Sequence, residues 1–122
     1  MIALLGFAIN VHAQPADMTG LACTRAVAFG IQTWEFFGDV ALRYNADGSF
    51  RRFHKIGTGA YEGFGKDGEW SSTYLFFKDD DQINVRLIAQ PGALKRDQDP
   101  LAPLETGVFP LNADCVPIWE KL

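Results

Sequence analysis

The sequence WSSTYLFFKDDDQINVRLIA, residues 70–89, has the hydrophobic alternation of two β-strands joined by an acidic turn. In the first half Tyr74 and Phe76 stand two positions apart, and in the second half Val85 and Leu87 do the same. Side chains of a strand point to opposite faces at successive positions, so this period of two is typical of strands with one buried face. The sequence therefore predicts an antiparallel hairpin here.

The three consecutive aspartates between these strands, Asp79, Asp80 and Asp81, raise the question of a calcium site. Calcium usually takes six to eight oxygen ligands, and the spacing of an EF-hand loop with its glycine and final glutamate is missing. We interpret the aspartates as the charged tip of the hairpin, and the sequence predicts no metal and no cofactor.

A second hairpin is predicted upstream, over residues 40–56. Apolar and polar residues alternate in VALRY (40–44), and NADG (45–48) supplies a turn in which Gly48 is free to take a positive φ. The returning strand is SFRRFHKI (49–56).

The positive charges of this returning strand are divided between its two faces. Arg52 and His54 share one face, while Arg51 and Lys55 lie on the other. A nucleic-acid backbone needs one continuous basic stripe. With a net charge of -4 for the whole chain, we expect no nucleic-acid partner.

Arg52 and His54 are the first candidate ligand-binding residues, and they share their face with Phe50. If this face points into a barrel, both side chains become polar groups in an aromatic cavity. A buried arginine needs a partner, either an acidic ligand or a carboxylate such as Glu35, Asp39 or Glu69. A site on the strand and an internal salt bridge therefore both remain open.

The other segments also favour short strands. Residues 23–37 are predicted as a strand, with one helical turn as the alternative, and the five glycines of 57–68 indicate a wide loop or a bulged strand. Residues 90–103 are predicted to form a surface loop. Two short final strands follow, limited to edges or ends by their prolines. We expect one all-β domain, an antiparallel meander of six to eight strands closing into a small barrel, with a β-sandwich as the alternative.

The amino terminus differs from the rest of the chain. Residues 1–13, MIALLGFAINVHA, form an apolar run of the length of a secretory signal peptide, with a cleavage site after Ala13. No Lys or Arg precedes this run, so an apolar first strand is the alternative. We expect residues 14–122 to form the mature domain, periplasmic or secreted, without a membrane span.

The two cysteines, Cys23 and Cys115, lie near opposite ends of this domain. In an oxidising compartment they are expected to form one disulfide bond. Two free thiols are the alternative. Neither cysteine has a neighbouring Cys or His, which disfavours a metal site or a Cys-x-x-Cys redox centre.

Three aromatic residues, Tyr61, Phe64 and Trp70, lie in or beside the glycine-rich stretch. If the mouth of a cavity opens there, they would contact a ligand. Most of the aromatic residues must instead form the core, because each buries a large apolar area.

The segments DGSF (47–50), the glycine-rich stretch and GEW (68–70) together resemble the small lipocalin-like, calycin-type β-barrel domains of bacterial secreted proteins. The similar region spans about residues 34–90. This resemblance implies an apolar or mixed cavity for a small ligand. It carries over no functional residue.

Three functions are compatible with this pattern. The first is a secreted or periplasmic protein that binds a small apolar or weakly acidic ligand. The second is an interaction module, such as an inhibitor or accessory subunit of another exported protein. The third is a small barrel lyase, isomerase or cyclase that uses His54 and Arg52. Barrel folds host all three, so only the site can separate them.

Overall fold

A computed structural model describes residues 13–65, 70–92 and 104–121 of the chain. Residues 1–12 of the secretory signal predicted at 1–13 and most of the loop predicted at 90–103 lie outside these residues, as do Lys66, Asp67, Gly68 and Glu69. Within the described part, no helix has the length and apolar character needed to cross a membrane.

The described residues form strands and one short carboxy-terminal helix. These elements are β1 (Ala13–Pro15), β2 (Leu21–Val27), β3 (Gly30–Phe36), β4 (Val40–Tyr44), β5 (Phe50–Gly57), β6 (Ala60–Phe64), β7 (Trp70–Asp79), β8 (Gln82–Pro91), β9 (Glu105–Pro110), β10 (Asp114–Pro117) and α3 (Ile118–Lys121).

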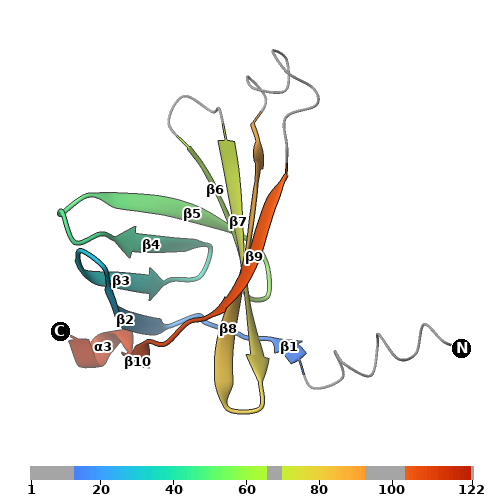
Figure 1. Ribbon diagram of the computed structural model, residues 1–122. Coiled ribbons are helices and arrows are strands. Elements are labelled where there is room, and N and C mark those ends of the chain that lie inside the picture. The colour runs from blue at the N-terminus through green and yellow to red at the C-terminus, as the bar shows by residue number, and fades with distance from the viewer. Residues whose placement is uncertain (1–12, 66–69, 93–103, 122) are drawn as a thin grey trace, which may run out of the picture.

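The strands from β2 to β9 follow one another in a single antiparallel meander, which confirms the predicted fold class. β10 pairs beside β2, and β1 pairs with the end of β7. Figure 1 shows how the sheet curls: β2, β3 and β4 lie on one side, β7, β8 and β9 on the other, and the long β5 spans between them. The strand order ends at β10 and at β9, so the sheet is a half-barrel.

Two differences from the predicted strand pattern have physical reasons. The single strand predicted over residues 23–37 is instead the β2–β3 hairpin, because the chain reverses at Ala28 and Phe29 before Gly30, whose φ is 137°. The second difference is β1, which the sequence did not predict as a strand. It pairs with β7 through only three residues, too few to show a hydrophobic period.

The interior of the half-barrel is a cluster of aromatic rings around Trp34. The Trp34 ring lies 5.1 Å from Phe53, 5.2 Å from Tyr74, 5.5 Å from Phe76 and 5.7 Å from Phe36, measured between ring centroids. These partners come from β3, β5 and β7, which lie on both sides of the curl. Burying rings of this size contributes on the order of a few kcal/mol each.

The predicted turns are present. In the β4–β5 turn Gly48 has a φ of 90°, and the Asn45 backbone N–H donates to the Ser49 carbonyl at 2.8 Å. At the tip of the β7–β8 hairpin Asp80 and Asp81 are exposed, and Asp80 has a φ of 54°. The aspartates therefore form the charged hairpin tip that the sequence indicated.

The glycine-rich stretch forms a bulge and the strand β6. The pairing of β5 with β6 shifts register between Lys55 and Gly57. At Gly59, whose φ is 69°, an added Cβ would lie 2.6 Å from the Ala16 carbonyl oxygen, so only glycine lets the chain after β1 pass this closely. Gly63 lies directly beneath the Phe53 ring, where an added Cβ would lie 2.6 Å from a ring carbon.

A disulfide bond joins Cys23 and Cys115, as predicted. The two residues are direct partners in the β2–β10 pair, with Cα atoms 4.0 Å apart. Pro110 and Pro117 are the last residues of β9 and β10, the two strands at the edges of the sheet, where a missing N–H costs no ladder hydrogen bond.

We expect Gly63→Ala to lower the free energy of unfolding by about 1–3 kcal/mol, because the new methyl group would overpack the Phe53 ring. Gly38→Ala is the control, since an added Cβ there meets nothing within 4 Å. Urea unfolding of both variants measures the difference. Equal stability of the two variants would contradict the packing described for Gly63.

Replacement of both cysteines by alanine is expected to lower the free energy of unfolding by roughly 2–4 kcal/mol, because the bond closes a loop across a sequence separation of 92. Urea unfolding of the oxidised protein and of the Cys23→Ala/Cys115→Ala variant tests this value. An unchanged midpoint would show that the unfolded chain gains little freedom when the bond is absent.

Candidate functional site

Arg52 and His54 lie on the outer face of β5, so the alternative in which they point into the barrel is not what the structure has. Both are exposed, whereas Phe53 between them is 2% exposed and belongs to the core. The reason lies in the ring cluster, because Phe53 packs on Trp34 and Tyr74 and this turns its neighbours outward. A ligand site or an enzyme active site inside the barrel cannot be built on Arg52 and His54.

The three aromatic candidates also separate in the structure. Tyr61 is fully buried and packs on Phe36 and Phe76, so it is a core residue. Phe64 is 60% exposed on the outer face of β6, and Trp70 is half-buried at the start of β7. The structure therefore does not bring Tyr61, Phe64 and Trp70 together at one cavity.

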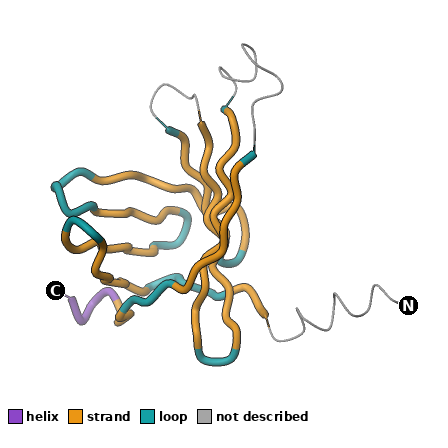
Figure 2. The backbone as a smooth tube through the Cα atoms, in the orientation of Figure 1, coloured by secondary structure: helices purple, strands orange, loops and turns teal. Residues whose placement is uncertain are grey.

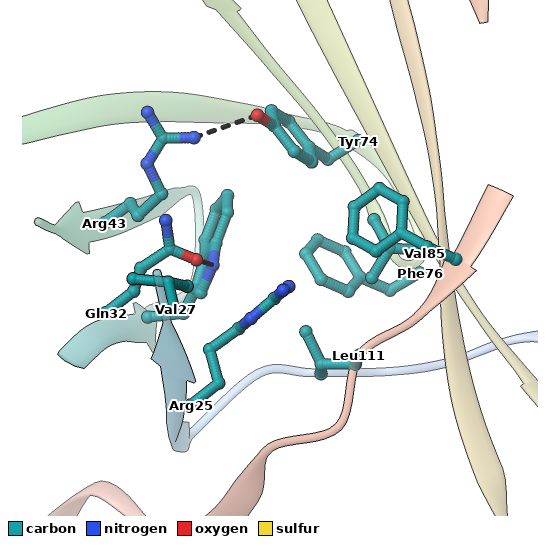
Figure 3. Close-up of a pocket in the computed structure, with 10 residues that line it drawn as sticks. Arg25, Val27, Gln32, Arg43, Tyr74, Phe76, Val85 and Leu111 are labelled. Atoms are coloured by element: carbon teal, nitrogen blue, oxygen red, sulfur yellow. Dashed lines mark hydrogen bonds between the residues drawn. The ribbon is translucent and has the colours of Figure 1, made fainter. Parts of the chain in front are cut away.

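The half-barrel instead has a hollow of about 200 Å³ between its two sides, open on one side to solvent. Figure 3 shows Arg25, Gln32 and Arg43 on one side of this cavity and Tyr74, Phe76 and Val85 on the other. The lining residues are Arg25, Val27, Gln32, Trp34, Arg43, Tyr74, Phe76, Val85, Phe109 and Leu111. We call this hollow the arginine cavity.

Arg43 is held in place by aromatic groups. Its guanidinium carbon lies 5.4 Å from the centroid of the Phe53 ring, 5.6 Å from Trp34 and 5.9 Å from Tyr74, within the range of cation–π attraction. Its Nη1 donates a hydrogen bond of 2.9 Å to the Tyr74 hydroxyl. Its Nε is buried and has no hydrogen-bond partner among the described residues.

Arg25 enters the same cavity from β2. Its guanidinium carbon lies 5.6 Å from the ring of Phe109 in β9, across the open side of the half-barrel. Its Nε is also buried without a hydrogen-bond partner in the described part of the chain. Gln32 pairs directly with Arg25 in the β2–β3 ladder, and its side-chain oxygen accepts a 3.2 Å hydrogen bond from the Trp34 indole N–H.

The electrostatics of the cavity favour an anion. Two guanidinium groups line it, and the lining residues that the structure describes include no Asp or Glu. Buried donors of a charged group are costly when they remain unpaired, and carboxylates match the planar fork of a guanidinium. The walls are otherwise aromatic and aliphatic. The arrangement is chemically suited to hold an acid group next to an apolar one.

A larger hollow, about 700 Å³, lies on the outer face of β7, β8 and β9. It is a broad groove, lined by apolar residues such as Phe77 and Val108 and by both Asp79 and Arg86. The described residues give it no buried, unpaired polar group of the kind that the arginine cavity has. The smaller cavity is therefore the better candidate site.

The described residues contain no cluster of three or more His, Cys, Asp or Glu side chains that could hold a metal ion. His54 has Val40 and Glu62 as its register partners in the sheet, and these residues do not form such a cluster.

Comparison with protein-family models, with curated proteins and with solved structures finds no match to this chain. The resemblance to lipocalin-like domains therefore stays a prediction. Any functional assignment depends on the residues of the cavity alone.

Sequence reasoning missed Arg25 and Arg43 as site residues, although one signal for Arg43 was present. Ala41 and Arg43 share a face of β4 opposite Val40, Leu42 and Tyr44. The apparently more hydrophobic face is the outer one: Ala41 is fully buried and Tyr44 is 36% exposed. An alanine between two larger apolar residues can mark the crowded inner face of a small barrel.

Tyr61 offers a test of the core. Burial is the main cause that raises the pKa of its phenol above 10.0, with a smaller opposing effect of Thr19. The folded protein thus holds this proton more tightly than the unfolded chain. This contribution to stability is complete below pH 10 and is lost as the pH rises through the folded pKa.

We therefore expect the free energy of unfolding to fall above pH 10, and to fall less in Tyr61→Phe. At pH 7 this variant should be within about 1 kcal/mol of the wild type or more stable, because the buried hydroxyl has no hydrogen-bond partner within 3.5 Å among the described residues. Urea unfolding at pH 7 and pH 10.5 measures both effects. A large loss at pH 7 would contradict this account.

Proposed function

We propose that the protein is a secreted or periplasmic binding protein whose arginine cavity takes a small organic acid. The observation that supports this proposal most directly is that the guanidinium groups of Arg25 and Arg43 line one cavity whose described lining residues include no Asp or Glu. An anionic group would supply acceptors to both arginines. The aromatic walls would contact the apolar part of the ligand.

The charge of the cavity supports this proposal because its sign is opposite to the net charge of the chain. The whole protein carries a net charge of -4, whereas the cavity contributes two positive side chains. Neutralising a half-buried guanidinium is worth more than pairing a fully exposed one, because water screens the exposed pair more strongly. An acid should therefore prefer this cavity to the arginines of the outer face.

The size of the cavity restricts the acid. Its volume of about 200 Å³ lies below the roughly 300–1,000 Å³ that is common for drug-sized ligands. The group beside the arginines must therefore be small. A carboxylate with a short apolar neighbour fits this description better than a sugar or a nucleotide.

Two features are compatible with the exported location that the proposal assumes. The disulfide bond is compatible with an oxidising compartment, and the apolar start of the sequence is the predicted secretory signal.

The proposal is tested by titrating the isotope-labelled protein with butyrate and with its neutral analogue butyramide, followed by NMR. We expect butyrate to shift the side-chain signals of the cavity arginines and the Trp34 indole N–H, and butyramide to bind at least tenfold more weakly. Arg25→Gln and Arg43→Gln should each weaken butyrate binding by about tenfold or more, because a charge-assisted hydrogen bond is lost.

Arg52→Gln is the matched control, since Arg52 is exposed on the outer face of β5. It should leave butyrate binding unchanged. Arg25→Lys and Arg43→Lys keep the charge and guard against loss of the fold when the long side chain is shortened. Equal binding of butyrate and butyramide, or an equal effect of Arg52→Gln, would contradict the proposal.

One observation favours the second candidate function, an interaction module. Several aromatic side chains are exposed on the outer face, including Phe50 at 57%, whose ring lies 6.0 Å from that of Tyr44. Exposed aromatic groups that lie together are typical of protein-binding surfaces. If the folded wild-type protein binds no acid in the butyrate titration, this candidate becomes the better one.

A further inference from the structure

A second hollow lies beside the arginine cavity, at one end of the half-barrel. It has a volume of about 360 Å³ and is lined by Val27, Phe29, Gln32 and the residues Asn45, Ala46 and Asp47. Val27 and Gln32 line both hollows. The two hollows are therefore neighbours that share these two side chains as wall, and we call the second one the mouth.

Two turns that are distant in the sequence build this mouth. Figure 2 shows the β2–β3 turn and the β4–β5 turn side by side at one end of the half-barrel. They are in contact: a Cβ added to Gly30 would lie 2.7 Å from the Cβ of Ala46. Contact between the turns fixes the mouth to the same end of β2 that carries Arg25 and Val27.

Phe29 is the apolar surface of the mouth. It is 93% exposed, more than any other large hydrophobic residue in the described part of the chain. A phenylalanine in this position has no packing role in the fold. A ligand that extends from the arginine cavity past Val27 would cover it and gain the free energy of burying apolar area.

The polar groups of the mouth are engaged within the turn. The Ser49 hydroxyl and backbone N–H donate to Asp47 Oδ1, at 2.5 Å and 2.9 Å, and both hydrogen bonds lower the pKa of this carboxyl. The Asn45 side-chain amide donates to the Ser49 hydroxyl at 3.1 Å. Asp47 therefore places a negative charge at the mouth, while Arg25 and Arg43 place positive charges inside.

We propose that the ligand is an elongated monoacid, with its anionic group at Arg25 and Arg43, its chain lying over Val27 and Gln32, and its apolar end against Phe29. This inference rests on the proposed function and adds the shape and orientation of the ligand. The charges at the two ends orient it, because a second anionic group at the far end would face Asp47. The protein thus selects monoacids over diacids of equal length.

The experiment is a titration series with butyrate, hexanoate and octanoate and with the diacid suberate, which has the length of octanoate. Wild-type affinity should rise with chain length, up to about fourfold for each methylene that becomes buried. Phe29→Ser should reduce the gain from butyrate to octanoate several-fold and leave butyrate unchanged. Phe50→Ser, at an exposed aromatic residue of the outer face, is the matched control and should leave the whole series unchanged.

Octanoate should bind several-fold more tightly than suberate, and Asp47→Asn, which keeps an acceptor for Ser49, should narrow this difference. The inference is overturned if butyrate binds but affinity does not rise with length, if Phe29→Ser keeps the full gain, or if suberate binds as tightly as octanoate. Those results leave the proposed function intact. Failure of butyrate and of all longer acids to bind would overturn both.

Discussion

The packing of Trp34 is the interaction on which the rest of the structure depends. Its ring contacts Phe53 of β5 and Tyr74 and Phe76 of β7, so one side chain holds together strands from both sides of the curl. Without such a contact, a meander of short strands has no reason to bend over itself, because its hydrogen bonds are equally satisfied in a more open sheet. The same packing decides which residues of each neighbouring strand face inward.

The cavity is a direct consequence of this ring cluster. The faces of Trp34, Phe53 and Tyr74 surround the guanidinium of Arg43, which lets a cation stay inside the half-barrel without a carboxylate partner among the described residues. Cation–π attraction offsets only part of the cost of desolvating a guanidinium. Arg25 adds a second charge from the open side. Partial burial of these two guanidinium groups therefore lowers the stability of the fold, which is common in binding sites.

Alternation predicted the strands of this protein well but did not identify their inner faces. Strand β5 has two faces, and either could have been the inner one. The first face carries Phe53 with Arg51 and Lys55. The second carries Phe50 and Ile56 with Arg52 and His54. The second face holds more apolar residues, yet it is the outer one, with Phe50 and Ile56 each 57% exposed. Phe53 takes the inner position of β5, where its register partner is the small Ala41 and its ring packs on Trp34 and Tyr74.

The sequence by itself determined the all-β class, the hairpins over 40–56 and 70–89, the turn at Gly48, the acidic tip at 79–81 and the Cys23–Cys115 bond. These features are local, or depend on a single pair of residues, so period and turn chemistry suffice to find them. Only the tertiary structure decided that Arg25 and Arg43 meet in one cavity and that Arg52 and His54 do not. The reason is physical: which face of a strand is buried depends on the side chains that other strands bring to it, and those contacts exist only after the sheet has curled.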